Sequence, residues 1–241
     1  MLGSEFDYAK FLILADQDEA GQLWTNWQRL VSAGDPKLIK QCKLTSLGAQ
    51  TIVSGKRRYV FECWGETARY VSCLGEYWLR RATRLDVKTS MLSWIDQDVD
   101  NLAARWKIVD KSRNVQTFQS RSRTKRDGRS AGGRGIALGS HKSDLRISVY
   151  KRPKDCYRLE VQASGRLLRR LVAEALEEWF QTRDAPTPVL WDLTRENILG
   201  TGIDRCLKSA GLPEYTLPDE IPAPDLKTLF DPHGSGNSSN N

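Results

Sequence analysis

Leu145-Arg-Ile-Ser-Val-Tyr-Lys-Arg152 is followed, after a short turn, by Cys156-Tyr-Arg-Leu-Glu-Val-Gln-Ala163, and both stretches alternate apolar and polar residues. Such alternation predicts two β-strands that form a hairpin. Side chains two apart on a strand share a face, so each strand has one apolar and one polar face. The polar faces carry Arg146, Ser148, Tyr150, Arg152, Arg158, Glu160 and Gln162. The hairpin is therefore expected to display a tyrosine among cations and beside a glutamate.

A third stretch, residues 83–89, repeats this pattern with Leu85 and Val87 on its apolar face and Asp86 on its polar face, between Arg84 and Lys88. If the three strands are neighbours in one sheet, their polar faces combine into one site. Such a site suits transesterification on DNA, because a phenol can attack a phosphate while cations hold the backbone. A metal bound by carboxylates would polarise the phosphoryl oxygens.

The rest of the chain mixes strand and helix patterns without a regular βαβ order. Strands are predicted at residues 6–14, 50–54, 58–64, 115–120 and 135–138, and helices at residues 18–31, 66–81, 96–106, 165–181 and 189–210, the last interrupted by Gly200 and Gly202. We expect an α+β fold with a central antiparallel sheet, helices on one face and two loosely similar halves. Residues 1–212 would form this domain, and residues 213–241, which are Pro-rich and acidic, a disordered tail.

Composition excludes several classes of protein. No apolar run approaches the length of about 20 residues that a membrane helix needs, so no membrane contact is expected. Five scattered cysteines without a CxxC pair, and only two histidines, argue against a zinc site and a disulfide framework and fit a reducing cytoplasm.

The net charge is +7, and its distribution is uneven. Residues 111–158 hold fourteen Lys or Arg against three Asp. This segment is typical of a footprint on a phosphate backbone, although a basic loop exposed to solvent is the simpler alternative.

Four segments, in order, resemble the Rep_trans family of rolling-circle replication initiators. They are Thr83-Arg-Leu-Asp86, Gly139-Ser-His-Lys-Ser-Asp144, Ile147-Ser-Val-Tyr150 and Arg158-Leu-Glu160. Upstream, Phe61-Glu-Cys-Trp-Gly65 before a helix is also similar to the family pattern. The chain departs from that pattern at Ser90 and Ser148, where the family usually has Asp and Arg.

The resemblance implies a Rep nuclease-like fold and a nickase that initiates replication or transfer of a plasmid, phage or conjugative element. Tyr150 would attack the DNA, form a 5′-phosphotyrosyl link and free a 3′-OH primer. Asp86 and Glu160 would bind Mg²⁺ or Mn²⁺, with His141 and Asp144 as further ligands or phosphate contacts. Partners would be origin DNA, single-stranded or hairpin, a helicase of the host or element, and a second copy of the chain.

Each role has a structural alternative. Tyr150 could be an ordinary half-buried strand tyrosine, and Tyr157 is a rival nucleophile. Asp86 and Glu160 could instead form ion pairs with the arginines two residues before them. The residues expected to contact phosphates, which could equally form a solvated charged face, are Arg84, Lys142, Arg146, Lys151, Arg152 and Arg158.

Two other functions compete with the nickase. The first is a non-catalytic module that binds origin DNA on the same fold, which the serines at 90 and 148 suggest. The second is an RNA-binding α+β domain, which ranks last because the strands lack the paired aromatic signature of an RRM.

Overall fold

The computed structural model describes residues 4–34, 36–47, 56–91, 96–109, 115–119, 134–140, 142–151, 157–182 and 185–210. Its strands form one eight-stranded sheet in the order β2-β3-β1-β4-β8-β7-β6-β5, and every neighbouring pair is antiparallel. The strands are β1 (Ser4–Ala15), β2 (Cys42–Ser46), β3 (Arg57–Trp64), β4 (Ala82–Met91), β5 (Val115–Gln119), β6 (Arg134–Leu138), β7 (Leu145–Lys151) and β8 (Tyr157–Ser164). The antiparallel α+β class expected from the sequence is confirmed.

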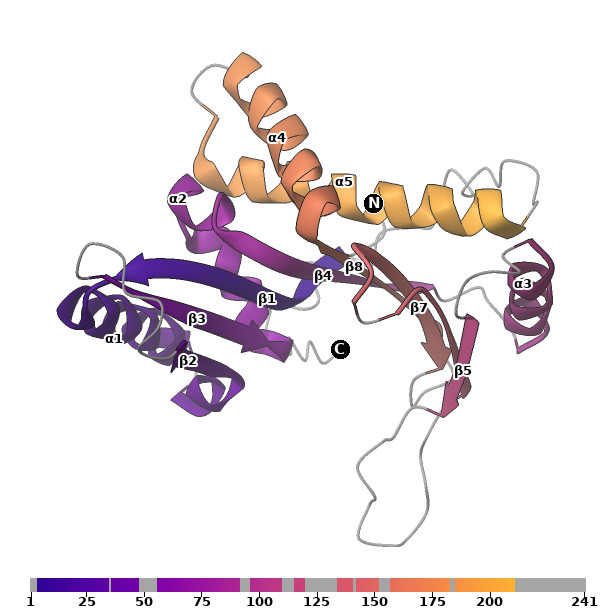
Figure 1. Ribbon diagram of the computed structural model, residues 1–241, viewed down its shortest axis with the longest axis horizontal. Coiled ribbons are helices and arrows are strands. Elements are labelled where there is room, and N and C mark those ends of the chain that lie inside the picture. The colour runs from indigo at the N-terminus through magenta and orange to yellow at the C-terminus, as the bar shows by residue number, and fades with distance from the viewer. Residues whose placement is uncertain are drawn as a thin grey trace, which may run out of the picture.

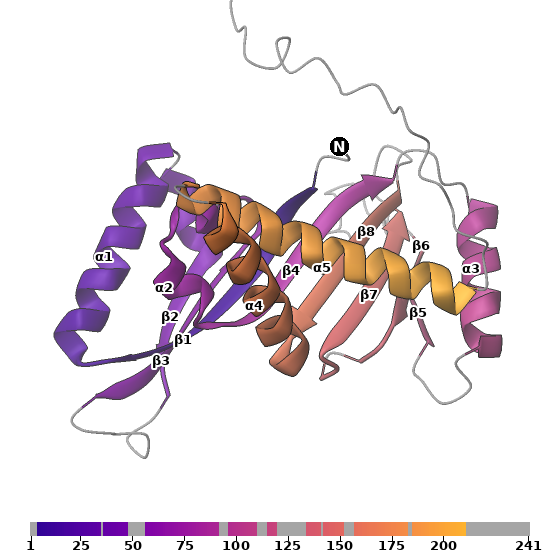
Figure 2. The same ribbon diagram turned by 90° about the horizontal axis from the view of Figure 1, so that it is seen from above.

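Helices cover one face of this sheet. They are α1 (Gln17–Gly34), α2 (Glu76–Leu79), α3 (Asp96–Val109), α4 (Gly165–Gln181) and α5 (Thr187–Ala210), with 3₁₀ helices η1 (Pro36–Gln41) and η3 (Gly65–Cys73). Figures 1 and 2 show α4 and α5 on the same side of the sheet, with α5 running across β4, β8 and β7. One sheet face therefore lies against helices, while the other carries no helix among the described elements.

An aromatic cluster joins the sheet to its helices. The ring of Phe61 on β3 lies 4.9 Å from Trp27 of α1 and 5.7 Å from Phe11 of β1, centroid to centroid. Phe11 also contacts Trp78 of α2 and Trp191 of α5. These rings come from segments far apart in the sequence, so their burial fixes α1, α2 and α5 against β1 and β3.

The Gly139–Asp144 motif acts first as a structural turn. Gly139 has a φ of 90°, and a Cβ there would meet the Leu145 carbonyl oxygen at 2.6 Å. Asp144 accepts a hydrogen bond from the backbone N–H of Arg166 at 3.1 Å. The turn thus joins β6 to β7 and places a carboxylate at the N-terminus of α4, where the helix has free N–H groups.

Three elements differ from the sequence predictions. The partner of β3 is β2 at Cys42–Ser46, not residues 50–54, which lie outside the described residues. The helix predicted at residues 66–81 is divided into η3 and α2, because Leu74 and Gly75 have extended backbone between them. In contrast, α5 continues through Gly200 and Gly202; the second glycine lets the helix approach the Val161 side chain on β8 more closely than a Cβ would permit.

Within the described residues, no helix is both long enough and apolar enough to cross a membrane. The predicted domain end at residue 212 and the predicted tail, residues 213–241, lie outside the described part of the chain.

Candidate active site

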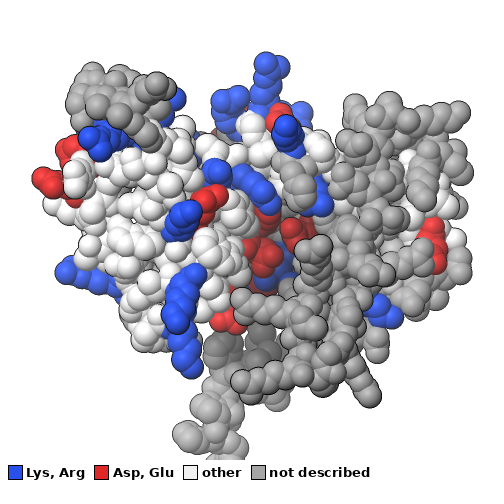
Figure 3. All heavy atoms as spheres, turned by 60° about the horizontal axis from the view of Figure 1, so that its bottom comes forward, with Lys and Arg blue, Asp and Glu red and all other residues white. Residues whose placement is uncertain are grey.

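The sheet face turned away from the helices, here called the open face, collects the polar side chains of the alternating strands. Figure 3 shows acidic side chains near the middle of this face, with basic side chains around them. Four antiparallel strands supply them, because β1, β4, β8 and β7 are consecutive neighbours in the sheet. The expectation that the strands of residues 83–89, 145–152 and 156–163 lie side by side therefore agrees with the order of β4, β8 and β7.

Tyr150 lies on the open face and is half-buried. Its hydroxyl donates a hydrogen bond to Oε2 of Glu160 on β8, with the two oxygens 3.0 Å apart. Directly opposite Tyr150 in the ladder is Arg158. Two guanidinium nitrogens of Arg158, Nε and Nη1, are buried and have no hydrogen-bond acceptor among the described residues. A phenol that contacts a carboxylate is thus placed beside cationic donors that still have hydrogen bonds to make.

Asp86 on β4 is 2% exposed and is paired with Arg84 on the same strand. The Nε of Arg84 donates to Oδ1 at 2.8 Å and its Nη2 donates to Oδ2, so both carboxylate oxygens accept from one guanidinium. The ladder places Asp86 opposite Gln162 and Lys88 opposite Glu160, which makes Asp86 and Glu160 diagonal neighbours. The ion pair that the sequence allowed as an alternative is therefore formed at Asp86.

The electrostatics of this site follow from burial. Burial raises the pKa of Asp86 to about 6; Arg84 opposes this, while Glu160 and Asp7 add to it. Burial also lowers the pKa of Arg146 on β7, against the influence of Glu160. Carboxylates on β1, β4 and β8 thus lie close enough to repel one another, a situation that an added positive charge would relieve.

A second tyrosine–glutamate pair, which the sequence analysis missed, lies on the open face at β1 and β3. The Tyr8 hydroxyl donates to Glu62, which also accepts an ion pair from Lys10 at 3.4 Å. The Arg84 guanidinium lies 4.5 Å above the Tyr8 ring. Burial, followed by the bond to Glu62, raises the pKa of Tyr8. The alternation of Tyr8 and Lys10 with buried Ala9 and Phe11 was the signal available in the sequence.

Lys88 of β4 is a cation that lies beside the acidic residues near the N-terminal end of β1. Its ammonium contacts Asp7 and lies 3.1 Å from Glu5, although only a small part of its side chain reaches solvent. Arg69 of η3 also pairs with Glu5. These two cations pair with acids of β1, whereas Glu160 of β8 accepts the hydrogen bond from Tyr150 and is the diagonal neighbour of Asp86.

The donor set fits a divalent cation in its chemistry. Mg²⁺ keeps several waters and is commonly held by one or two carboxylates together with substrate phosphates, and Asp86 and Glu160 supply two carboxylates from adjacent strands. In the ranges that the structure describes, no three His, Cys, Asp or Glu side chains are grouped as a metal site. A cation at Asp86 would also have to compete with Arg84 for its oxygens.

Other predicted residues lie elsewhere. Lys151 is on the opposite side of β7 from Tyr150, with its ammonium 5.9 Å from the ring of Tyr157. Tyr157 is 1% exposed within the core, which excludes it as a nucleophile. Lys142 is exposed in the turn before β7. Arg152 and His141 lie outside the described residues, so their predicted roles stay predictions.

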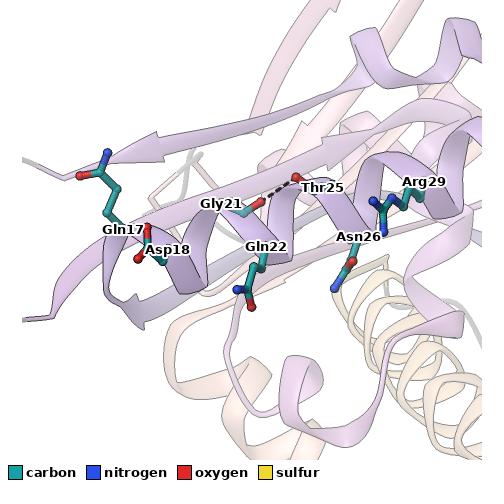
Figure 4. A pocket seen from close by; sticks show the side chains of 7 residues that line it. All are labelled: Gln17, Asp18, Gly21, Gln22, Thr25, Asn26 and Arg29. Atoms are coloured by element: carbon teal, nitrogen blue, oxygen red, sulfur yellow. Dashed lines mark hydrogen bonds between the residues drawn. The ribbon is translucent and has the colours of Figure 1, made fainter.

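A hollow also lies along the outer side of α1, away from the open face. All its lining residues, from Gln17 to Arg29, belong to this one helix, and Figure 4 shows the Thr25 hydroxyl bonded to the Gly21 carbonyl within it. Because no second element of the described chain brings side chains toward it, the described lining lacks the converging polar groups of a binding site.

Comparison of the chain with protein-family models, curated proteins and solved structures gave no match. The resemblance to the replication initiators therefore rests on the four sequence segments.

Proposed function

We propose that this protein is a rolling-circle replication initiator that nicks one strand of origin DNA with Tyr150 as its nucleophile. The observation that carries this proposal is the Tyr150–Glu160 hydrogen bond beside the unsatisfied N–H groups of Arg158. A simple strand tyrosine does not need buried guanidinium donors next to it. A phosphodiester placed there would give those donors acceptors and bring a phosphorus atom to the phenol.

The chemistry is a transesterification. The phenolic oxygen of Tyr150 attacks phosphorus, the Oη–P bond forms and the bond from phosphorus to the 3′ oxygen breaks. The phenolic proton passes to Oε2 of Glu160, and the departing 3′ oxygen takes a proton from solvent water to become the 3′-OH primer. Arg158 and Arg146 would hold the phosphate oxygens, because a guanidinium matches the geometry of phosphate.

Asp86 and Glu160 would hold Mg²⁺ or Mn²⁺, which would supply charge neutralisation at the phosphoryl oxygens. In this proposal, Arg84 keeps Asp86 ionised and in place, since it contacts both carboxylate oxygens. The α+β class of the sheet is compatible with a Rep nuclease-like domain. The proposal includes this domain type, a cytoplasmic location and a helicase as partner.

A non-catalytic origin-binding module is the second candidate. It is favoured by the pairing of Asp86 with Arg84, which leaves both oxygens of a proposed metal ligand occupied. Such a module would use the same arginines to bind DNA but would form no covalent intermediate.

Covalent adduct formation separates these two functions. Single-stranded oligonucleotides that tile the DNA flanking the coding sequence are incubated with the protein and Mn²⁺, and adducts that survive SDS are detected on gels. We expect an adduct at Tyr150 by peptide mass spectrometry, and its loss in Tyr150→Phe. Tyr8→Phe is the matched control, because Tyr8 also bonds a glutamate on the open face.

Two results would overturn the nickase. An equal adduct in Tyr150→Phe would remove Tyr150 from the chemistry. Salt-sensitive binding to these oligonucleotides without any adduct would establish the binding module instead.

A further inference from the structure

Exposed apolar and aromatic side chains lie along the β1–β3 part of the open face. Among the described residues, Leu12 and Leu14 of β1, Leu47 just after β2 and Trp64 of β3 are large hydrophobics exposed to solvent. Alternation places Trp64 on the same face as Glu62, and the ladder pairs it with Tyr8. Trp64 is 39% exposed, so part of this residue is accessible to a ligand.

The sheet register connects Trp64 to the candidate active site. Trp64 lies opposite Tyr8, and Tyr8 opposite Asp86. Asp86 in turn lies opposite Gln162, which pairs with Arg146 on β7. One row of open-face residues thus runs from Trp64 to Arg146 across five strands. At a strand spacing of about 4.8 Å, the row is about 19 Å long.

Basic side chains accompany this row. Lys10 of β1 and Lys43 of β2 both lie opposite Glu62 on β3, one from each side. Lys10 is ion-paired with Glu62, and Lys43 is exposed. Arg58, further along β3, is exposed on the same face. Across β2, β3 and β1, the two lysines flank the single Glu62. This part of the described open face therefore has a net positive charge, which is complementary to a polyanion.

We infer that Trp64, with Lys10 and Lys43, is a second contact site for single-stranded DNA, which holds the strand some nucleotides away from the phosphate at Tyr150. This inference rests on the proposed function, since it assigns the ligand of the same face. An exposed aromatic ring beside cations is the usual way to bind single strands without sequence preference, because every base has a face that can stack. Arg146, at the end of this row, lies on the same face of β7 as Tyr150 and four residues before it, so a strand that follows the row would continue along β7 to reach Tyr150.

The test measures binding alone, by fluorescence anisotropy of a labelled twenty-nucleotide oligothymidine without divalent metal. All variants carry Tyr150→Phe, so that no covalent adduct forms. We expect Trp64→Ala to weaken binding by about tenfold and Trp64→Phe by less, because phenylalanine still offers a stacking face. We plot the logarithm of the binding constant against the logarithm of the salt concentration. Lys10→Ala and Lys43→Ala should each reduce the slope of this plot by the amount expected for about one lost phosphate contact.

Phe180 provides the matched control. It is an aromatic residue of α4, 60% exposed and on the helical side of the sheet. We expect Phe180→Ala to bind as the parent does. Trp64→Ala should unfold at a somewhat lower temperature than the parent, because much of the residue is buried, but thermal unfolding should show it folded at the assay temperature.

The inference fails if Trp64→Ala binds oligothymidine as well as the parent, or if Phe180→Ala weakens binding equally. It also fails if Trp64→Ala instead changes the mass in analytical ultracentrifugation with no effect on DNA, which would make this surface a contact between two copies. Failure of the proposed function gives a different result. If binding depends on Trp64 but the protein with Tyr150 forms no covalent adduct, the DNA contact at Trp64 stands and the nickase is refuted.

Discussion

Two tyrosine–glutamate pairs lie on the open face, one in the β1–β3 part of the sheet and one at β7 and β8. Tyr8 bonds Glu62 and Tyr150 bonds Glu160, both through the phenolic hydroxyl. Their surroundings differ. Arg84 stacks on the Tyr8 ring and Lys10 pairs with Glu62, whereas Tyr150 faces Arg158, whose Nε and Nη1 have no acceptor among the described residues. The same pair of residue types is therefore flanked by paired cations at Tyr8 and by guanidinium donors without acceptors at Tyr150.

The two parts also share an order of elements. β1 is followed by α1 and by the hairpin of β2 and β3, and β3 returns beside β1. β4 is followed by α3 and by β5 to β8, and β8 returns beside β4. Each returning strand carries the glutamate and ends at a glycine with positive φ, Gly65 or Gly165, where a helix begins. The comparison therefore has matched positions that can be mutated one against the other.

The largest stability effect is expected at Asp86. Asp86→Ala leaves the guanidinium of Arg84 partly buried without its carboxylate, and removal of one partner from a buried pair costs about 3–5 kcal/mol. Glu62→Ala should cost only about 1 kcal/mol, because Tyr8 and Lys10 can turn toward water. Urea unfolding at pH 7 measures both. Equal losses would show that the two pairs support the fold alike.

The second prediction concerns pH. With the Asp86 pKa raised to about 6, the folded state holds a proton that the unfolded state has released. Between about pH 4 and 6 the unfolding free energy should therefore fall as pH rises, with Asp86 contributing at most about 3 kcal/mol.

Asp86→Asn cannot titrate, so its stability relative to the parent should rise through the same window. Glu160→Gln should narrow the pH range over which stability falls, because Glu160 raises the pKa of Asp86. Urea unfolding from pH 4 to 7 provides the comparison, and parallel curves for the parent and Asp86→Asn would contradict the assignment.

Smaller losses of stability than at Asp86 are expected at the matched glycines. Gly65→Ala should cost about 1–2 kcal/mol, because an L-residue there must adopt a left-handed backbone. At Gly65 the new Cβ would meet only the flexible Gln41 side chain, at 2.8 Å. Gly165→Ala should cost about 1 kcal/mol more, because its Cβ would displace the Asp144 carboxylate from the start of α4.

Gly200→Ala is the control for these glycines. It lies in α5 with open space around it, and alanine should stabilise the protein by about 0.5–1 kcal/mol. Thermal unfolding ranks the three variants. A Gly165→Ala variant as stable as Gly65→Ala would show that Asp144 does not hold the helix.

Sequence alternation predicted the strands well where polar and apolar residues strictly alternate, as at Leu145–Lys151 and Tyr157–Ser164. The helical spacing of apolar residues predicted both ends of α4, Gly165–Gln181, because this spacing is regular along the helix. Alternation failed at β2, whose short sequence Cys-Lys-Leu-Thr-Ser has too few residues to show a period. It also missed Tyr8, because a tyrosine on a strand is ordinary until its partner is known.

The sequence alone determined which side chains share a face, since that depends only on the two-residue period of a strand. It thereby placed Arg84 with Asp86, and Tyr150 on the same face as Arg146. Only the tertiary structure decided which faces meet, because strand order and register depend on packing between distant segments. That packing gave Tyr150 a bond to Glu160 and buried Asp86 in its ion pair with Arg84.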